Sequence, residues 1–499
     1  MVANPWGFLR HPRTEAPKRP VAERLRDWDP VYGRPAAEAV RVQASRCMDC
    51  GVAFCHAGCP LGNLIPEWNE LVADDDWRAA IERLHATNNF PEFTGWLCPA
   101  PCEASCVLAI NADPVAIKQV ELAIVDRAHD EGWVVARPPA ERTGRKVAVI
   151  GSGPAGLAAA QQLTRAGHAV VVYERSDRIG GLLRYGIPDF KMPKGAIDRR
   201  LAQLEAEGTE FRAGVDIGGE DGLDPAALRA EVDAVVLATG ALHPRDLEIP
   251  GRELGGVHQA MDYLPLANRV RTGDLAAPSI SAAGKHVVII GGGDTAADCL
   301  GTANRQGALS VTQLDHNPRP PEARDITANP WPQWPKIHRT SLAHEEGVVE
   351  SWAREAVEFL ADDEGTERSE QAGTVRAVVT EEVQILRVEG RRVFRPVPGS
   401  RAEVPCELVL VAAGFLGTER GSLLDRLDVD VDADRGTIRV CGGWETSADG
   451  VYACGDSTRG ASLVVWAIAE GRACAAAVDT ALTGRSELPA PVRPGARPL

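Results

Sequence analysis

What this sequence lacks already excludes several classes of protein. It contains no apolar run of about 18 residues, so we expect no membrane-spanning segment. It has no long basic run, and 54 Lys and Arg against 70 Asp and Glu leave a formal net charge of −16. That balance argues against binding to nucleic acid or to an anionic membrane surface. The N-terminal segment lacks the apolar core of an export signal, so we expect a cytoplasmic protein.

The cysteines are not expected to form disulfides, because thiols stay reduced in the cytoplasm. The chain has 12 of them, and seven lie between Cys47 and Cys106. The other five stand singly among apolar or small residues, which predicts small buried core side chains. These five are Cys299, Cys406, Cys441, Cys454 and Cys474.

The pattern of apolar residues changes near residue 145. Before it, apolar residues recur at helical spacing, and short loops rich in Pro, Gly and Cys separate the helical segments. From Lys146 onward apolar strands alternate with helices, as in KVAVIG, GLAAAQQLTRAG and AVVVYE, and the plan recurs from HVVIIG to SVTQLD. Such βαβ units predict parallel sheets covered by helices. We therefore predict the α/β class, with a helical N-terminal domain followed by two Rossmann-like dinucleotide-binding domains.

The first βαβ unit carries a dinucleotide fingerprint, GSGPAG. Gly151 permits the tight turn, Gly153 lets the backbone approach a pyrophosphate, and Gly156 lets the helix pack closely on the strand. The helix N-terminus supplies free N–H groups for the phosphates. Glu174, which ends the next strand, can accept hydrogen bonds from ribose hydroxyls. The remaining residues predicted for this site are Pro154, Ala155 and Arg175.

The second unit repeats the fingerprint as GGGDTA, with alanine in the third glycine position. A duplicated fold that binds nothing is the alternative interpretation of this repeat. The predicted binding residues are Gly291, Gly293, Asp294, Thr295, Ala296 and Asp315.

Two further segments, DAVVLATG and GVYACGD, look like the remaining signatures of the two-dinucleotide flavoprotein family. That resemblance implies FAD at the first fingerprint, with Asp456 contacting the ribityl or phosphate part of the flavin. It implies NAD(P)H at the second fingerprint, which lies where the family inserts its nicotinamide-binding domain. The alternative for Asp456 is a turn residue or helix cap, and Lys191 is either near the flavin ring or a surface lysine. The other implied contacts are Gly181, Leu182, Thr239, Gly240 and Gly455.

The choice between NADH and NADPH depends on the residues after the second strand of the second unit. That strand ends at Asp315, and no arginine precedes Arg319. A carboxylate suits a free ribose 2′-hydroxyl and repels a 2′-phosphate. The sequence therefore favours NADH, although Arg319 or Arg324 could fold back toward the site.

The N-terminal cysteines fall into two groups. Cys47, Cys50, Cys55 and Cys59 come first, and the second group is Cys98, Cys102 and Cys106. Sulfur ligation suits zinc or an iron–sulfur cluster, and the Cys59–Pro60 pair resembles the end of the bacterial ferredoxin motif. Seven thiolates exceed one zinc site by three and fall one short of two all-cysteine clusters. Two 4Fe–4S clusters are favoured, and one cluster with spare thiols or a structural zinc remain alternatives.

Taken in order, the segments CMDCGVAFCHAGCP, CPAPCEASC, GSGPAG, GGLLRYGIPDFKMPK, GGGDTAADC and YACGD closely resemble the small (β) subunit of glutamate synthase. Dihydropyrimidine dehydrogenase carries the same module in its N-terminal half. The resemblance implies one cluster on Cys47, Cys50, Cys55 and Cys106, and a second on Cys59, Cys98 and Cys102.

The eighth ligand implied by this resemblance is a Glu or Gln from the following helix. Glu121 stands at the matching place, Gln119 is the rival, and a solvated helix glutamate is the alternative interpretation. The chain also departs from NADPH-using members, because it has HN where they carry an RR pair. The tryptophans of NPWPQWPKIHR are assigned no role in the site.

The resemblance implies the electron-input subunit of glutamate synthase. Such a subunit oxidises NAD(P)H, reduces FAD and relays electrons through 4Fe–4S clusters to a large FMN-containing α subunit, which makes L-glutamate from glutamine and 2-oxoglutarate. The alternative is an electron-bifurcating or ferredoxin-linked NAD(P)H oxidoreductase subunit. A disulfide reductase is disfavoured because no CxxC adjoins either dinucleotide unit. No catalytic acid or base is predicted, because hydride transfer depends on proximity and orientation.

The expected domain boundaries follow from these motifs. Residues 1–144 form a helical iron–sulfur domain, 145–255 and 411–485 the two parts of the FAD-binding domain, 256–410 the NAD(P)-binding domain, and 486–499 a flexible tail.

Overall fold

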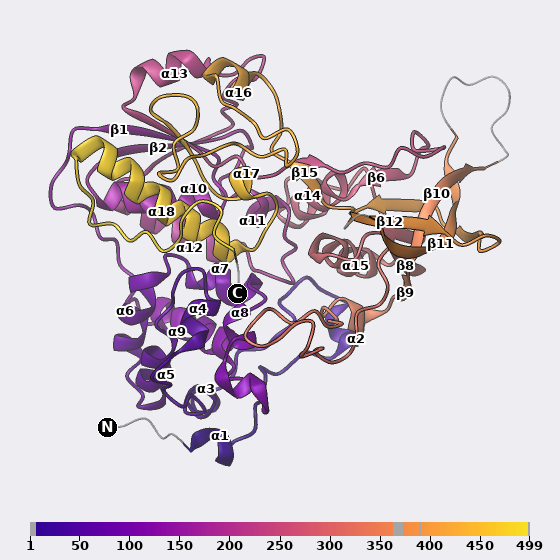
Figure 1. Cartoon of the computed structure of the whole chain (residues 1–499), viewed down its shortest axis with the longest axis horizontal. Coiled ribbons are helices and arrows are strands. Elements are labelled where there is room, and N and C mark those ends of the chain that lie inside the picture. Colours follow the sequence, from indigo (N-terminus) through magenta and orange to yellow (C-terminus); the bar gives the residue numbers. More distant parts are fainter. Residues whose placement is uncertain (1–5, 363–372, 389–390, 498–499) are drawn as a thin grey trace.

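The computed structural model describes residues 6–362, 373–388 and 391–497. Figure 1 shows a helical N-terminal part, two parallel sheets with their helices, and an antiparallel sheet that projects to one side. In the described ranges, no helix has the length and apolarity that a membrane crossing requires.

The N-terminal part consists of short helices joined by the loops that carry most of the clustered cysteines. Three of the helices, α5, α7 and α8, have proline in the first turn, where the missing N–H removes no helical hydrogen bond. Trp68, Phe90 and Phe93 are completely buried between them. The helices are α1 (Gly7–Arg10), α2 (Val21–Arg24), α3 (Ala37–Ala44), α4 (Phe54–Gly58), α5 (Ile65–Ala73), α6 (Trp77–Thr87), α7 (Pro91–Leu97), α8 (Pro101–Ala104), η1 (Val107–Ile110) and α9 (Ile117–Asp130).

The first parallel sheet has the strand order β16-β4-β1-β2-β3. Its central strands are rich in valine and buried on both faces, as a sheet covered by helices requires. Two of its helices, α10 and α18, cross closely because Gly471 has no side chain: a Cβ there would lie 2.2 Å from the carbonyl oxygen of Ala155. The strands are β1 (Lys146–Ile150), β2 (Ala169–Glu174), β3 (Glu210–Ala213), β4 (Ala234–Leu237) and β16 (Val451–Ala453). The helices are α10 (Pro154–Arg165), α11 (Leu182–Tyr185), α12 (Gly195–Glu207), α13 (Pro225–Glu231), α16 (Ser422–Leu427), α17 (Asp456–Arg459) and α18 (Val464–Thr483).

The second parallel sheet repeats this plan with the order β6-β14-β7-β8-β9. Both predicted Rossmann-like units are therefore confirmed, as is the α/β class. Its strands are β6 (Val257–Gln259), β7 (His286–Ile290), β8 (Ser310–Asp315), β9 (Val349–Trp352) and β14 (Leu408–Val411), and its helices are α14 (Ala260–Arg271), α15 (Asp294–Gln306) and η2 (His344–Glu346).

An antiparallel sheet between β9 and β14 is a feature that the sequence did not predict. Its strands are half exposed and alternate charged with apolar residues, so they contain no long apolar run. The strands are β10 (Arg354–Ala361), β11 (Val375–Val388), β12 (Arg391–Pro396) and β13 (Ala402–Pro405), and a separate antiparallel pair joins β5 (His243–Pro244) to β15 (Phe415–Gly417).

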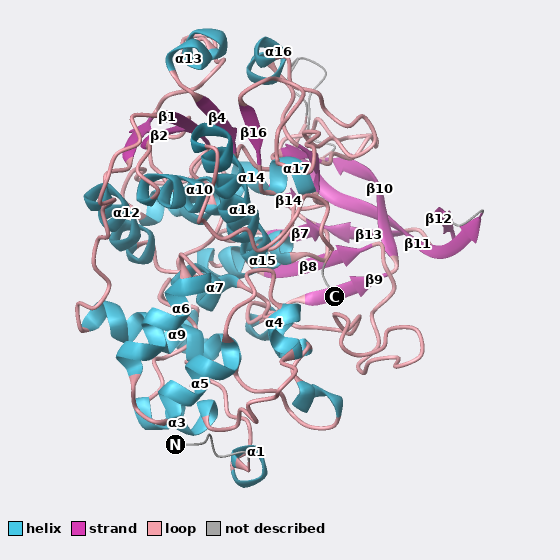
Figure 2. Cartoon of the chain, turned by 60° about the vertical axis from the view of Figure 1, so that its left-hand side comes forward, coloured by secondary structure: helices cyan, strands magenta, loops and turns pink. Residues whose placement is uncertain are grey.

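The helical part packs directly on the first sheet's helices, and the two share one core (Figure 2). Trp68 and Phe90 belong to the same buried cluster as Leu157 of α10 and Ile468 of α18. A completely buried ion pair crosses this junction, since Arg200 of α12 donates two hydrogen bonds of 2.6 Å to the carboxylate of Glu92 in α7.

Four of the five isolated cysteines are buried, as expected. The expectation is wrong for Cys441, which lies in an exposed loop and donates its thiol to Glu445 at 2.6 Å. Small neighbouring residues at this position indicate a surface turn and not a core.

Candidate functional site

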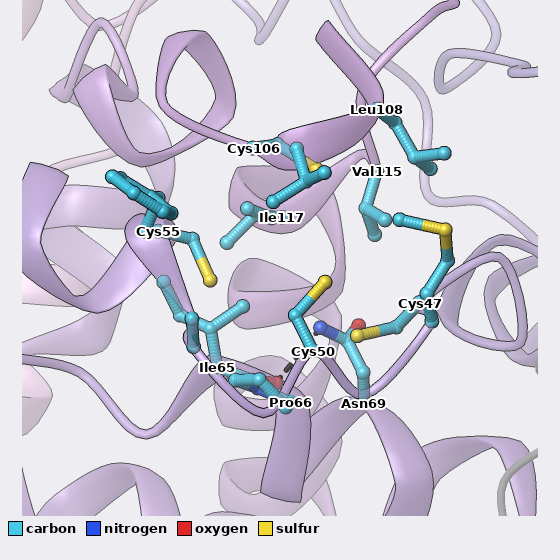
Figure 3. Close-up of a pocket in the computed structure, with 14 residues that line it drawn as sticks. Cys47, Cys50, Cys55, Ile65, Pro66, Asn69, Cys106, Leu108, Val115 and Ile117 are labelled. Atoms are coloured by element: carbon cyan, nitrogen blue, oxygen red, sulfur yellow. Dashed lines mark hydrogen bonds between the residues drawn. The ribbon is translucent and has the colours of Figure 1, made fainter. Parts of the chain in front are cut away.

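Four thiols of the N-terminal part surround one cavity. Cys47 and Cys50 lie on the loop after α3, Cys55 lies within α4, and Cys106 directly precedes η1. With Phe54 and other apolar side chains they line one pocket, and Figure 3 shows the labelled cysteines around it. Four thiolates around an apolar space are the donor set of an iron–sulfur cluster.

A second cavity is lined by the other three thiols and one carboxylate. Cys59 and Cys98 follow the last turns of α4 and α7, Cys102 lies in α8, and Glu121 comes from the middle of α9. Gln119, on the same helix, is not among the lining residues. The structure thus gathers the eight donors into the two groups that the resemblance implies.

The environment of Glu121 is unusual for a carboxylate. Its side chain is buried, with a relative exposure of 5%, which excludes the solvated-glutamate interpretation. Burial raises the pKa of Glu121 to about 7, although hydrogen bonds from Thr94 and Asn88 act in the other direction and lower it. A carboxylate in such a place is costly unless it is partnered, and a cationic metal centre supplies a partner.

Five of the seven clustered cysteines are buried as well, and Cys47 and Cys50 are partly buried. Burial raises the pKa of Cys47 to about 12 and that of Cys59 to about 11, so both are protonated until a metal displaces the proton. Within the described residues, no three His, Cys, Asp or Glu side chains form a group suited to one metal ion. The donors instead surround two cavities, and their chemistry fits iron–sulfur clusters.

The first glycine turn forms a cradle at the start of α10. Gly151 has φ +102°, and a Cβ there would lie 2.4 Å from the carbonyl oxygen of Ala238. A Cβ on Gly156 would lie 2.0 Å from the oxygen of Gly151. A Cβ on Gly153, in contrast, would meet nothing within 4 Å. The first and third glycines therefore serve packing, whereas the second leaves open the space that a pyrophosphate requires.

Glu174, the last residue of β2, accepts hydrogen bonds from this turn. Its Oε2 accepts hydrogen bonds from the backbone N–H of Ser152 at 3.2 Å and from the Ser152 hydroxyl at 2.6 Å. Gly180 N–H in turn donates to the Ser152 oxygen at 2.8 Å. Ser152 is completely buried and was missed from the sequence, because it occupies a variable position of the fingerprint.

Two glycines from later segments, Gly181 and Gly455, pack against this first glycine turn. Gly181 has φ +53°, and its Cβ position lies 2.9 Å from Cα of Gly153. Gly455 has φ +76°, and its Cβ position lies 2.6 Å from Cβ of Ala155. Both approaches are possible only without a side chain, so glycine is required at each position.

The other predicted flavin contacts lie around the same edge of the sheet. Asp456 is half buried at the start of α17, where it accepts a hydrogen bond from Ser462 at 2.8 Å, and burial raises its pKa. Arg175 instead forms an ion pair with Glu419 at 2.6 Å. Thr239 and Gly240 follow β4, Pro154 and Ala155 open α10, and Leu182 opens α11.

The second glycine turn has the same form. Gly291 has φ +135°, and a Cβ there would lie 2.2 Å from the oxygen of Ala412, whereas a Cβ on Gly293 would meet nothing within 4 Å. Asp294, Thr295 and Ala296 form the first turn of α15, whose free N–H groups face this opening.

Asp315 lies directly against this turn, since its Oδ2 would be 1.9 Å from a Cβ on Gly292. Its Oδ1 accepts hydrogen bonds of 2.8 Å from both the backbone and the side-chain nitrogen of Asn317. These hydrogen bonds fix the carboxylate beside the second glycine turn.

The arginine linked to Asp315 through Asn317 is not one of the two that the sequence suggested. Arg319 pairs with Glu322 at 2.6 Å, and Arg324 donates to backbone carbonyls of its own loop. Arg392, on β12, donates to Oδ1 of Asn317 at 2.6 Å. It was missed because the unpredicted antiparallel sheet brings it there from far along the chain.

Lys191 links the two dinucleotide-binding parts. Its ammonium group pairs with the carboxylate of Asp298 on α15. Burial alone would lower the pKa of Lys191, but the carboxylates of Asp298 and Asp294 raise it overall.

Two protein-family models match the chain. The model described as pyridine nucleotide-disulphide oxidoreductase matches residues 145–471. The model described as dihydropyrimidine dehydrogenase domain II, 4Fe-4S cluster, matches residues 24–133.

Several curated proteins are similar over the whole chain. The glutamate synthase [NADPH] small chain of Mycobacterium tuberculosis is 58% identical over all of both chains. That of Bacillus subtilis is 44% identical, covering 98% of this chain and all of the relative. Glutamate synthase [NADH] of Schizosaccharomyces pombe is 45% identical, covering 97% of this chain but 23% of that longer protein.

Among solved structures, FprA from Mycobacterium tuberculosis in complex with NADPH is similar, with a TM-score of 0.52 and 21% identity over 68% of this chain and 84% of that one. This likeness shows a shared fold.

Proposed function

Since the chain belongs to the glutamate synthase small-chain family, we propose that it is the electron-input subunit of a glutamate synthase. It is an NAD(P)H-dependent oxidoreductase whose cofactors are FAD, a nicotinamide nucleotide and 4Fe–4S clusters. Bound together, these groups supply hydride transfer from NAD(P)H followed by one-electron transfer. The proposed acceptor is a large FMN-containing subunit that makes L-glutamate from glutamine and 2-oxoglutarate, and the proposed location is the cytoplasm.

We assign the two cavities as the two cluster sites. The first would use Cys47, Cys50, Cys55 and Cys106, and the second Cys59, Cys98, Cys102 and Glu121. The observation that carries this assignment is the division of eight donors, four to each cavity.

The neighbours of each cavity support a direction of electron flow. Val465, in the first turn of α18, lines the second cavity, and α18 begins just after the flavin-site residues Gly455 and Asp456. The first cavity is lined only by N-terminal residues, and its Cys47 and Cys50 are partly exposed. The second cavity therefore lies on the flavin side, and the first cavity is the proposed exit.

The chain's own residues bind and orient the reactants. Gly153 and the N-terminus of α10 would hold the FAD pyrophosphate, and Gly293 and the N-terminus of α15 that of the nicotinamide nucleotide. The domain limits that the sequence motifs predict, from 1–144 to 486–499, are part of this proposal.

The test compares the chain alone with the chain plus a large FMN-containing subunit. Alone, it should reduce an artificial acceptor such as ferricyanide with NAD(P)H and form no glutamate. With the large subunit, glutamate should form from glutamine and 2-oxoglutarate. Reduction of ferredoxin with no glutamate formed would contradict the proposal and support the ferredoxin-linked alternative.

A further inference from the structure

The loop between β8 and η2 leaves the nicotinamide-binding part and reaches the first cysteine cavity. Its Trp331 ring lies 4.6 Å from the Phe54 ring, centroid to centroid, at an angle of 51°. The indole Nε1–H donates to the carbonyl oxygen of Cys106 at 3.3 Å. Beside it, the Ser105 hydroxyl donates to the Pro332 carbonyl at 3.1 Å. Figure 1 shows this loop passing close to α8.

The loop is built to hold this position. Asn329 is buried, and its amide nitrogen donates to the carbonyl oxygen of Trp334 at 3.1 Å. Its amide oxygen accepts from the N–H of Lys336 at 2.8 Å. The guanidinium of Arg324 adds a hydrogen bond of 2.7 Å to the carbonyl of Gln333. These hydrogen bonds connect residues before and after Trp331. They hold the turn that carries its ring in a fixed shape.

Phe54 and Cys106, the two partners of these Trp331 contacts, belong to the wall of the first cavity. Phe54 is next to Cys55 in α4, and Cys106 is one of the four donors. Cys47 and Cys50, two further donors of this cavity, are partly exposed. The indole therefore packs on the Phe54 side of this cavity wall.

We propose that Trp331 is a positioning residue for the cluster on Cys47, Cys50, Cys55 and Cys106. It fixes the backbone of one ligand through its N–H, and it keeps water from the Phe54 side of the cluster. The inference rests on the cluster assignment made under the proposed function. Solvent exposure and hydrogen bonding around the ligands set the reduction potential of such clusters. Trp331 thus connects the nucleotide-binding part to the exit end of the electron path.

The test uses the cofactor-loaded chain with Trp331→Ala and Trp331→Phe, and Trp334→Ala as the matched control. The Trp334 ring stacks on Arg339 at 4.1 Å in the same loop, whereas the Trp331 ring packs on Phe54 of the first cavity. A redox titration followed by EPR gives the midpoint potential of each cluster. Visible absorbance gives the rate of cluster loss in air.

Trp331→Ala should raise the potential of one cluster, because added water stabilises its more negative reduced form. The same variant should lose absorbance in air several-fold faster than the unsubstituted protein. Trp331→Phe keeps the ring and loses the N–H, so its shifts should be smaller. Trp334→Ala should match the unsubstituted protein.

Unchanged potentials and bleaching in both Trp331 variants would overturn the inference, as would equal changes in both clusters. If Trp331→Ala does not fold, Trp331→Phe decides by the same criterion. An unsubstituted protein without any cluster signal would instead refute the proposed function.

Discussion

The carboxylate of Glu121 makes the clearest prediction at the level of a single residue. Glu121→Ala removes a donor from the second cavity only, so one cluster should lose iron or change its EPR signal while the other keeps its signal. Gln119→Ala, two positions earlier on α9, should leave both signals unchanged. Intact spectra of both clusters in Glu121→Ala would remove this residue from the proposed ligands.

Asp315 and Arg392 predict the nucleotide preference. Asp315 favours a free 2′-hydroxyl, so kcat/KM should be higher for NADH than for NADPH. Asp315→Ala should reduce the NADH-to-NADPH ratio by about tenfold. Arg392→Ala should lower the remaining NADPH activity and spare NADH, because Arg392 is the cation held beside Asn317. A strong NADPH preference in the unsubstituted protein would contradict the assignment to Asp315.

At this scale the sequence predicted residues whose type and spacing are dictated by local chemistry. The cysteines, the glycines and Asp315 belong to this class. Ser152 and Arg392 could not be predicted, because their roles depend on contacts made across the fold. Trp331 was visible in the sequence, but nothing local indicates that it meets Phe54.

At the scale of elements, the glycine turn before α10 allows binding to be separated from folding. Gly153→Ala puts a methyl group into open space, so the protein should fold and bind FAD more weakly, by on the order of tenfold. Gly156→Ala should impair folding itself, because its Cβ would lie 2.0 Å from the oxygen of Gly151. Circular dichroism and FAD titration distinguish the two, and a Gly153→Ala protein with unchanged FAD affinity would contradict the assigned cradle.

The central strands of the parallel sheets were predictable because they are short, apolar and buried on both faces. The edge strands β3 and β9, none of whose residues is fully buried, were not predicted. The antiparallel sheet of β10 to β13 was not, because its exposed faces carry charges that break the apolar pattern. Burial pattern, more than strand propensity, therefore decided which elements could be predicted.

At the scale of the whole molecule, one buried ion pair joins the helical part to the first sheet's helices. Glu92→Ala would leave Arg200 buried and unpaired, which should lower the free energy of unfolding by roughly 3–5 kcal/mol. The matched control is Glu82→Ala, which breaks an exposed pair of the same 2.6 Å length with Arg137 and should cost less than about 1 kcal/mol. Denaturant unfolding of the cofactor-loaded protein measures both, and equal effects of the two substitutions would contradict the role of the buried pair.

The packing of the helical part on the flavin part could not be predicted from the sequence, because Glu92 and Arg200 are far apart in the chain. The order of the motifs, in contrast, was sufficient to identify the family. In the structure the second cysteine cavity lies against α18, a helix of the first parallel sheet, through Val465.

The most direct test of this account is the metal and flavin content of the protein purified without oxygen, together with its EPR spectrum. The account predicts about eight iron atoms per FAD and two cluster signals after reduction with NAD(P)H. A folded protein free of iron and flavin, or one that contains zinc in place of iron, would contradict it.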